Sequence, residues 1–174
     1  AEGYTFLYTR LDQALKDIYE NCDARDKKFS VTQFIPKPVD EVFAFFCKAE
    51  NLESITPPWL NFKIIKKSTE EVQEGSLIDY ELKVHGFPVS WRTRIESWKP
   101  PSSFVDTQVK GPYSKWHHTH TFEAVSGGTI MRDDVVYRLP VGALGSMLGG
   151  SIVSRDVREI FAYRRKKILD AFAA

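Results

Sequence analysis

Apolar and polar residues alternate through the middle of the chain, which is the pattern of strands that bury one face. The clearest run spans residues 78–85, with the apolar positions Ile78, Tyr80, Leu82 and Val84. The next run places one set of side chains on a common face: Val89, Trp91, Thr93 and Ile95. Further candidate strands cover residues 104–110, 114–125 and 129–139. Gly and Pro residues separate the candidate strands. Turns are predicted at Gly86 and Pro88 and at Gly127-Gly128. We therefore predict an antiparallel meander.

The pattern differs on either side of this meander. A strand at residues 29–35 is ended by prolines, and a short helix up to residue 46 and a helical turn at residues 51–55 follow it. Residues 151–173 repeat apolar positions at helical spacing, which predicts one helix of ~30 Å. The fold class is α+β: a curved antiparallel sheet with two short helices after the first strand, covered by a long C-terminal helix. A sheet and a helix arranged in this way leave a space between them, and a ligand can bind there.

Residues 1–28 are predicted to be an N-terminal extension, partly helical, and residues 29–174 a single ligand-binding domain. The helical spacing in the extension comes from Leu11, Leu15, Ile18 and Tyr19. The first residues lack the basic start and apolar run of a signal peptide, so we expect a cytoplasmic protein. A secreted chain that has already been processed would show the same pattern.

The charge balance excludes several classes of protein. The chain has 174 residues, with 24 Lys plus Arg against 23 Asp plus Glu, so a strongly electrostatic nucleic-acid binder is not expected. No apolar run reaches the length of a membrane span. Two cysteines are too few for a disulfide scaffold. The chain is rich in aromatic residues, with 12 Phe, 7 Tyr and 4 Trp, and these side chains can fill a core or line a pocket.

Four long segments carry a resemblance to a known family. They are PVDEVFAFFCKAENLESITPPWLNFKI (38–64), GFPVSWRTRIESW (86–98), FVDTQVKGPYSKWHHTHTFEAVSGGT (104–129) and DDVVYRLPVGALG (133–145). Together they resemble the SRPBCC superfamily of START-like, helix-grip ligand-binding proteins, closest to its polyketide cyclase/dehydrase-like bacterial branch. The resemblance covers roughly residues 29–172. It implies a hydrophobic cavity that holds lipids, polyketides or other apolar ligands, in a family whose members differ in whether they catalyse a reaction.

The segment from Trp116 to Phe122 carries the most specific polar signal. On a strand, one face presents Trp116, His118, His120 and Phe122. Two imidazoles at this spacing can reach one ligand or one metal ion. A zinc site needs a third protein ligand, and no HExxH or CxxC motif supplies it, so we expect hydrogen-bonded pocket groups, with no metal and no cofactor.

The neighbouring strand carries Asp133 and Tyr137 on one face, and a hairpin would bring them close to His118 or His120. An Asp–His pair satisfies both groups and fixes the imidazole tautomer. It can be a buried polar network or a general base for aldol cyclisation or dehydration. The catalytic candidates are therefore His118, His120, Asp133 and Tyr137. Asp106 stays ambiguous, because Val105 and Val109 have the opposite parity.

The function predicted from these features is binding or transport of a hydrophobic small molecule, with a cyclase/dehydratase-like enzyme as the alternative. A glycine-rich segment at residues 142–150 offers an apolar gate. The predicted ligand-binding residues are Trp91, Thr93, Ile95, Phe104, Trp116, His118, His120, Phe122, Tyr137, Leu144, Met147, Leu148, Val157 and Phe161.

The partner predicted for the chain is a hydrophobic small molecule. Monomer and homodimer both stay open. Four basic residues lie near the C-terminal helix end: Arg164, Arg165, Lys166 and Lys167. The simpler interpretation is that these residues form the charged outer face of the helix. The alternative is a transient contact with an anionic membrane surface.

Overall fold

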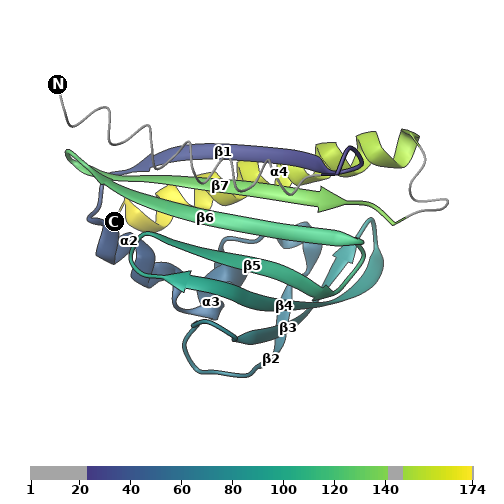
Figure 1. Ribbon diagram of the computed structural model, residues 1–174, viewed down its shortest axis with the longest axis horizontal. Coiled ribbons are helices and arrows are strands. Elements are labelled where there is room, and N and C mark those ends of the chain that lie inside the picture. Colours follow the sequence, from purple (N-terminus) through teal and green to yellow (C-terminus); the bar gives the residue numbers. More distant parts are fainter. Residues whose placement is uncertain (1–22, 141–146, 174) are drawn as a thin grey trace.

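Figure 1 shows the computed structural model of the chain, and the structure describes residues 23–140 and 147–173. The described part begins with β1 (Lys27–Ile35), α2 (Val39–Phe46), α3 (Ala49–Ser54) and a 3-10 turn η1 (Pro58–Leu60). Six strands follow: β2 (Lys63–Lys67), β3 (Leu77–Val84), β4 (Phe87–Lys99), β5 (Ser103–Lys110), β6 (Lys115–Val125) and β7 (Gly128–Arg138). The last element is the long helix α4 (Met147–Phe172).

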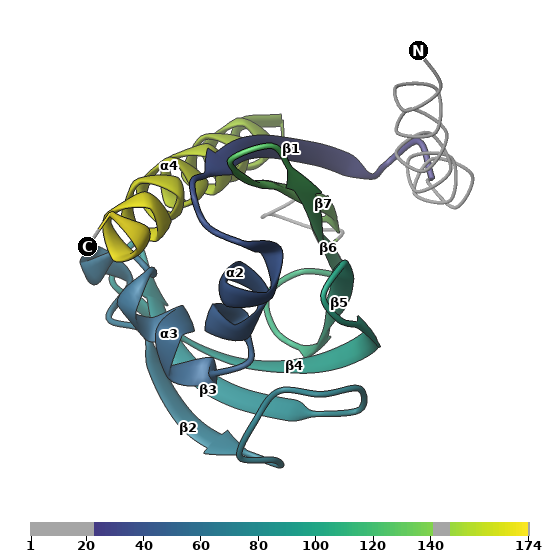
Figure 2. The same cartoon turned by 90° about the vertical axis from the view of Figure 1, so that its left-hand side faces the viewer.

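All seven strands form one antiparallel sheet in the order β1-β7-β6-β5-β4-β3-β2. Each strand from β2 to β6 pairs with the next one along the chain, and β1 pairs with β7. Seen from the end, the sheet bends round from β1 to β2 and α4 lies along its open side (Figure 2). The predicted α+β helix-grip fold, with two short helices after the first strand, is confirmed.

The turn between β3 and β4 differs from the prediction. His85 and Gly86 occupy it, with φ of 51° and 84°, whereas Pro88 lies within β4 opposite Lys83. Two consecutive residues with positive φ make a tight hairpin whose twist matches the flanking strands. Gly86 adopts such a conformation without steric cost, so the turn needs only two residues.

One end of the sheet is closed by a packed core beneath α2. Val42 and Phe43 of α2 are buried against Ile35 and Met131 of the sheet and Ile168 of α4. The phenyl ring of Phe43 also meets several neighbouring aromatic rings edge-on or tilted. These rings belong to Trp98, Phe104 and Phe122. The short helix therefore closes this end with side chains, and space is left farther along the sheet.

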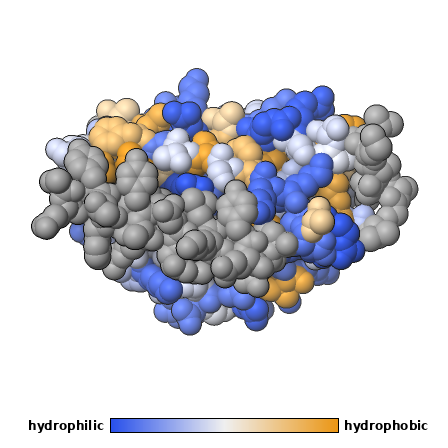
Figure 3. Space-filling view, turned by 45° about the horizontal axis from the view of Figure 1, so that its top comes forward, coloured by the Kyte–Doolittle hydropathy of each residue, from blue (hydrophilic) through white to orange (hydrophobic). Residues whose placement is uncertain are grey.

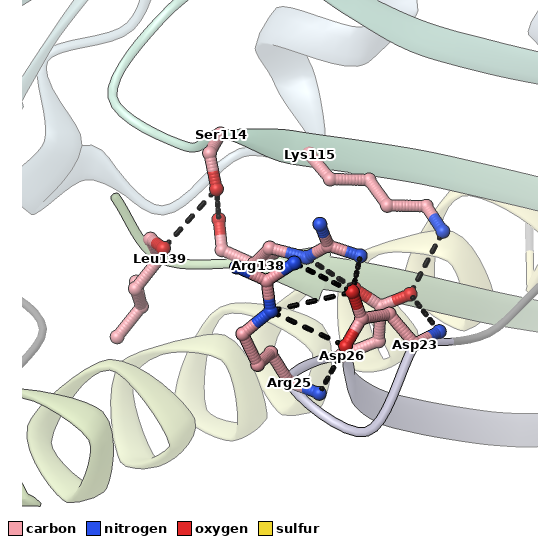
Figure 4. A network of polar contacts seen from close by, with 7 residues as sticks. All are labelled: Asp23, Arg25, Asp26, Ser114, Lys115, Arg138 and Leu139. Atoms are coloured by element: carbon pink, nitrogen blue, oxygen red, sulfur yellow. Dashed lines mark hydrogen bonds and ion pairs between the residues drawn. The ribbon is translucent and has the colours of Figure 1, made fainter. Parts of the chain in front are cut away.

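The start of β1 is held to the end of β7 by a network of ion pairs (Figure 4). The carboxylate of Asp26 accepts hydrogen bonds from Arg138 Nε at 2.7 Å and from Lys115 Nζ at 2.8 Å. Asp23 accepts from Arg25 and lies 3.4 Å from Arg138. Burial alone would raise the pKa of Asp26, but the hydrogen bonds from Arg138 and Lys115 outweigh burial and lower that pKa.

The division into an extension over residues 1–28 and a domain over residues 29–174 stays a prediction, because residues 1–22 lie outside the described residues. On the face shown in Figure 3, hydrophilic and hydrophobic side chains are interspersed where the surface is coloured. Arg165 and Lys166 are exposed on α4, whereas Arg164 is half-buried. Within the described part of the chain, every helix is too short or too polar to cross a bilayer.

Candidate functional site

A cavity of about 630 Å³ lies between the concave face of the sheet and α4. That volume is typical of sites for small organic ligands. Its wall is mostly apolar, from Leu60, Phe62, Leu82, Trp91, Trp116 and Ile160 among others. Alternation along β3, β4 and β6 directs Leu82, Trp91 and Trp116 inward, because every second residue of a strand faces the same side.

Most of the predicted ligand-binding residues line this cavity. They are Trp91, Thr93, Ile95, Phe104, Trp116, His118, His120, Val157 and Phe161. They come from three consecutive strands, β4, β5 and β6, and from α4. Arg164 of α4, which the sequence placed among the basic residues of the outer face, also lines the cavity, and its guanidinium lies 5.6 Å from the ring centre of Phe161.

Two predicted residues lie elsewhere among the described residues. Phe122 packs in the core under α2, because it is near the closed end of β6. Tyr137 is buried where α4 covers β7, and its hydroxyl lies 3.0 Å from Ser154 Oγ. Leu144 lies outside the described residues. Met147 and Leu148 begin α4, and the structure describes their backbone only.

The polar part of the cavity is a quartet of two histidines and two aspartates from three adjacent strands. Asp106 of β5 is the cross-strand partner of His118 on β6, and Asp133 of β7 is the partner of His120. Residues directly opposite each other on a sheet are close neighbours, and diagonal ones are within reach of long side chains. The register therefore brings each imidazole between two carboxylates.

The distances within this quartet are short on all sides. His118 Nε2 lies 3.0 Å from Asp133 Oδ1, and His118 Nδ1 lies 3.2 Å from Asp106 Oδ2. His120 Nε2 lies 3.0 Å from Asp106 Oδ2. His120 Nδ1 lies 2.8 Å from Asp133 Oδ1, but without the alignment of a hydrogen bond. Asp106, His118 and His120 line the cavity, whereas Asp133 holds the imidazoles from behind.

The electrostatics of the quartet favour the charged forms of His118, Asp106 and Asp133. Burial alone would lower the pKa of His118, but the carboxylates of Asp106 and Asp133 outweigh burial and raise it to about 9. Burial would likewise raise the pKa of each aspartate, and the two imidazoles instead hold both pKa values well below the ordinary value of 3.8. The site therefore presents buried ionic charge to an otherwise apolar space.

Aromatic rings fix the orientation of both imidazoles. Phe104 stacks on His120 with ring centres 4.0 Å apart and an interplanar angle of 18°. Phe161 of α4 meets His118 edge-on at 5.3 Å, and the two imidazole centres are 3.8 Å apart. Because the rings are packed on both sides, the quartet is held in place before any ligand binds.

A second, uncharged polar group lies on β3 and β4. The indole Nε1–H of Trp91 donates to Thr93 Oγ1 at 3.0 Å, and Tyr80 Oη lies 3.2 Å from the same oxygen. Burial raises the pKa of Tyr80 far above its ordinary value, which keeps the phenol neutral. Sequence reasoning placed Thr93 in the site but did not include Tyr80.

The cavity reaches the surface between the β3–β4 hairpin and α4. Phe87 and Ile152 line it and are 74% and 43% exposed. His85 Nε2 lies 2.7 Å from Asp156 Oδ2 and joins the hairpin turn to the helix across this opening. The opening therefore has an apolar rim and one polar contact between its two sides.

Comparison with known proteins now adds to this geometry. The family model described as "Polyketide cyclase / dehydrase and lipid transport" matches residues 35–162. The chain belongs to this family. The predicted membership of the SRPBCC superfamily is thereby confirmed. A search of curated proteins finds no match.

Solved structures share the fold of this family member at low identity. Protein CV1439 from Chromobacterium violaceum is 13% identical with a TM-score of 0.67, over 85% of this chain and 99% of that one. Ginseng major latex-like protein 151 from Panax ginseng is 11% identical with a TM-score of 0.64, over 87% and 100%. The di-domain ARO/CYC StfQ from the steffimycin biosynthetic pathway is 15% identical with a TM-score of 0.65, over 85% and 50%.

Family membership and cavity together support one coarse function. The protein binds a hydrophobic small molecule or carries out cyclase-type chemistry on one. Asp106 is the residue of the site that sequence reasoning left undecided. Phe104 could have indicated the direction of Asp106, because Phe104 and Asp106 lie on the same face of β5. If Phe104 points inward, Asp106 points inward too.

Proposed function

We propose that this protein binds and carries a hydrophobic small molecule that bears one oxygen-containing polar group. The observation that supports this is the combination of an apolar cavity of about 630 Å³ with a buried ionic cluster at its wall. The apolar walls supply affinity, and the quartet orients the polar group of the cargo. The cytoplasmic location stays a prediction.

Carriage is favoured over acid–base catalysis by the state of the imidazoles. Each of the four ring nitrogens of His118 and His120 lies within 3.2 Å of a carboxylate oxygen. A general base needs a lone pair directed at the substrate proton. Here both imidazoles face carboxylates on two sides, so the quartet suits the binding of a polar group better than the transfer of its proton.

Titration with a fluorescent fatty-acid analogue tests the proposal. Wild-type protein should bind one probe molecule per chain. Ile160→Trp adds an indole to the cavity wall and should weaken probe binding at least about tenfold, or 1.4 kcal/mol. Ile65→Trp is the matched control, because Ile65 is 53% exposed on β2 and does not line the cavity. This control should bind the probe as wild type does.

Native mass spectrometry of the purified chain gives an independent readout, because a tightly held cargo stays bound. Equal probe binding by both tryptophan variants, or no binding of the probe by wild type together with no bound mass, would contradict the proposal. Thermal unfolding of both variants checks that the difference does not come from misfolding.

A cyclase or dehydratase is the second candidate, favoured by the ionic quartet that opens into the cavity. It predicts turnover of a poly-β-keto substrate that falls when His118 or Asp106 is replaced. The carrier predicts binding of such a compound without any product. Product analysis by liquid chromatography therefore separates the two candidates.

A further inference from the structure

We propose that Asp106, His118 and His120 form a binding site at the wall of the cavity for one divalent transition-metal ion such as Zn²⁺. One ligand atom from each of these three side chains lies within 4.8 Å of the other two. Two imidazoles and a carboxylate are a donor set that suits such ions.

The spacing of the donor atoms fits a single ion. Asp106 Oδ2 lies 3.2 Å from His118 Nδ1 and 3.0 Å from His120 Nε2. Zinc binds imidazole nitrogen and carboxylate oxygen at about 2.0–2.2 Å, so ligand atoms around it are about 3.4 Å apart in a tetrahedron. The three side chains therefore need only small movements to admit the ion.

Asp133 supports the same assignment from behind. Its Oδ1 lies 3.0 Å from His118 Nε2 and 2.8 Å from His120 Nδ1, which are the nitrogens that face away from Asp106. Histidines that bind metals usually donate their other N–H to a carboxylate, and this contact fixes the tautomer. Asp133 makes this hydrogen bond with His118, and it lies close to His120 Nδ1 without the alignment of a hydrogen bond. The site therefore assigns His118 to coordinate through Nδ1 and His120 through Nε2.

The packing around the site keeps the donors in place. Phe104 stacks on His120, and Phe161 packs against His118 from α4. The side chains of His118 and Asp106 are 4% and 17% exposed, so little bulk water competes for the ion. Protons compete with a metal ion, because a nitrogen can coordinate the ion only when it carries no proton.

Three protein ligands leave at least one open coordination position on the metal ion. All three residues line the cavity, so that position faces the cavity. An oxygen of the cargo can occupy it, and this last step rests on the proposed function, whereas the metal site itself does not. The sequence predicted no metal because a third ligand was missing. Asp106 supplies that ligand through the register of β5 and β6.

Calorimetric titration of the tag-free, metal-stripped full chain with Zn²⁺ tests the proposal, with the absorption of Co²⁺ as a second probe. One ion should bind per chain. His118→Ala and Asp106→Asn should each weaken binding by at least about 100-fold, and Asp133→Asn by about 10–100-fold. His117→Gln is the matched control, since it removes a histidine from the opposite face of β6 and should leave affinity unchanged.

A measurement on wild type covers the case in which a variant fails to fold. Nitrogen-15 spectra of the imidazole rings with and without Zn²⁺ should show coordination through Nδ1 of His118 and Nε2 of His120. The proposal is overturned if wild type binds no Zn²⁺ or Co²⁺, if the spectra show other nitrogens, or if folded His118→Ala and Asp106→Asn bind as wild type. Because these titrations contain no apolar probe, their failure is separate from failure of the proposed function.

Discussion

Two clusters of charged residues each include side chains from β6 and β7, and they differ in the cations that face their carboxylates. At the end of β7, Asp26 is held by the ammonium group of Lys115 and the guanidinium group of Arg138, which cannot bind a metal ion as an imidazole can. At the cavity, Asp106 and Asp133 are held by His118 and His120, which can lose a proton or bind another group. Both clusters satisfy buried carboxylates, but only the second can exchange its partners.

The difference separates a structural role from a binding role. A carboxylate that faces Arg and Lys links two strands and is not expected to bind a ligand. A carboxylate facing imidazoles beside a cavity can yield its partner to a metal ion or to the polar group of a ligand. Substitutions should therefore change stability in both clusters but change ligand binding in only one.

The largest effect on stability is expected for Asp133→Ala. Its side chain is 5% exposed, and its removal leaves two imidazoles beside Asp106 alone. The free energy of unfolding should fall by about 3 kcal/mol, since breaking a buried ion pair leaves uncompensated charge. Urea denaturation measures this. Asp79→Ala, which removes a partner of Arg92 at the surface, is the control and should cost less than about 1 kcal/mol.

Asp26→Ala should have the next largest effect, about 2 kcal/mol of unfolding free energy, because its cationic partners are partly exposed and can be hydrated again. Binding of the fatty-acid analogue should stay at the wild-type value in this variant and change in Asp133→Ala. The opposite pattern would remove the distinction between the two clusters.

The contribution of Asp26 should also depend on pH. Its pKa in the folded protein is lowered relative to the ordinary value of 3.8, so its contribution is fully present above that value. The contribution is lost as pH falls further through the lowered pKa. The stability difference between wild type and Asp26→Asn should thus be constant from about pH 7 to about pH 5 and shrink towards about pH 3. Urea unfolding at each pH checks this, and a difference that grows in acid would refute it.

The smallest effect is expected at the opening of the cavity. Asp156→Asn weakens the contact between His85 and α4 and should speed release of the fatty-acid analogue about twofold, because surface ion pairs contribute little. Stopped-flow fluorescence measures the release rate. Lys167→Gln, which removes a surface partner of Asp170 farther along α4, should leave that rate unchanged.

Local pattern predicted the sheet and three of the four members of the quartet, His118, His120 and Asp133. Strict alternation in β3, β4 and β6 placed Trp91, His118 and His120 on the inner face, because each strand contains large apolar residues of the same parity. Asp106 could not be placed, since β5 has valines on its outer face and only Phe104 on its inner face to set the parity.

Tyr137 was misplaced relative to the cavity for a different reason. Its inward direction followed from the strand, but its surroundings depend on where α4 crosses the sheet, and Val157 and Phe161 set that position by packing against Val135 and Tyr137. No local pattern encodes this contact. The possible metal ligands have the same difficulty, because the third donor depends on cross-strand register and not on linear spacing.

The pairing of the first strand with the last one has a consequence for how the molecule is assembled. Each hairpin from β2 to β7 joins neighbours along the chain and can form early, whereas Lys27 meets Tyr137 only after nearly all of the sheet has been made. During synthesis, β1 is expected to stay an unpaired strand until its partner β7 has been made. Because α4 follows β7 in the chain and forms one wall of the cavity, a nascent chain that stops short of α4 has no closed cavity.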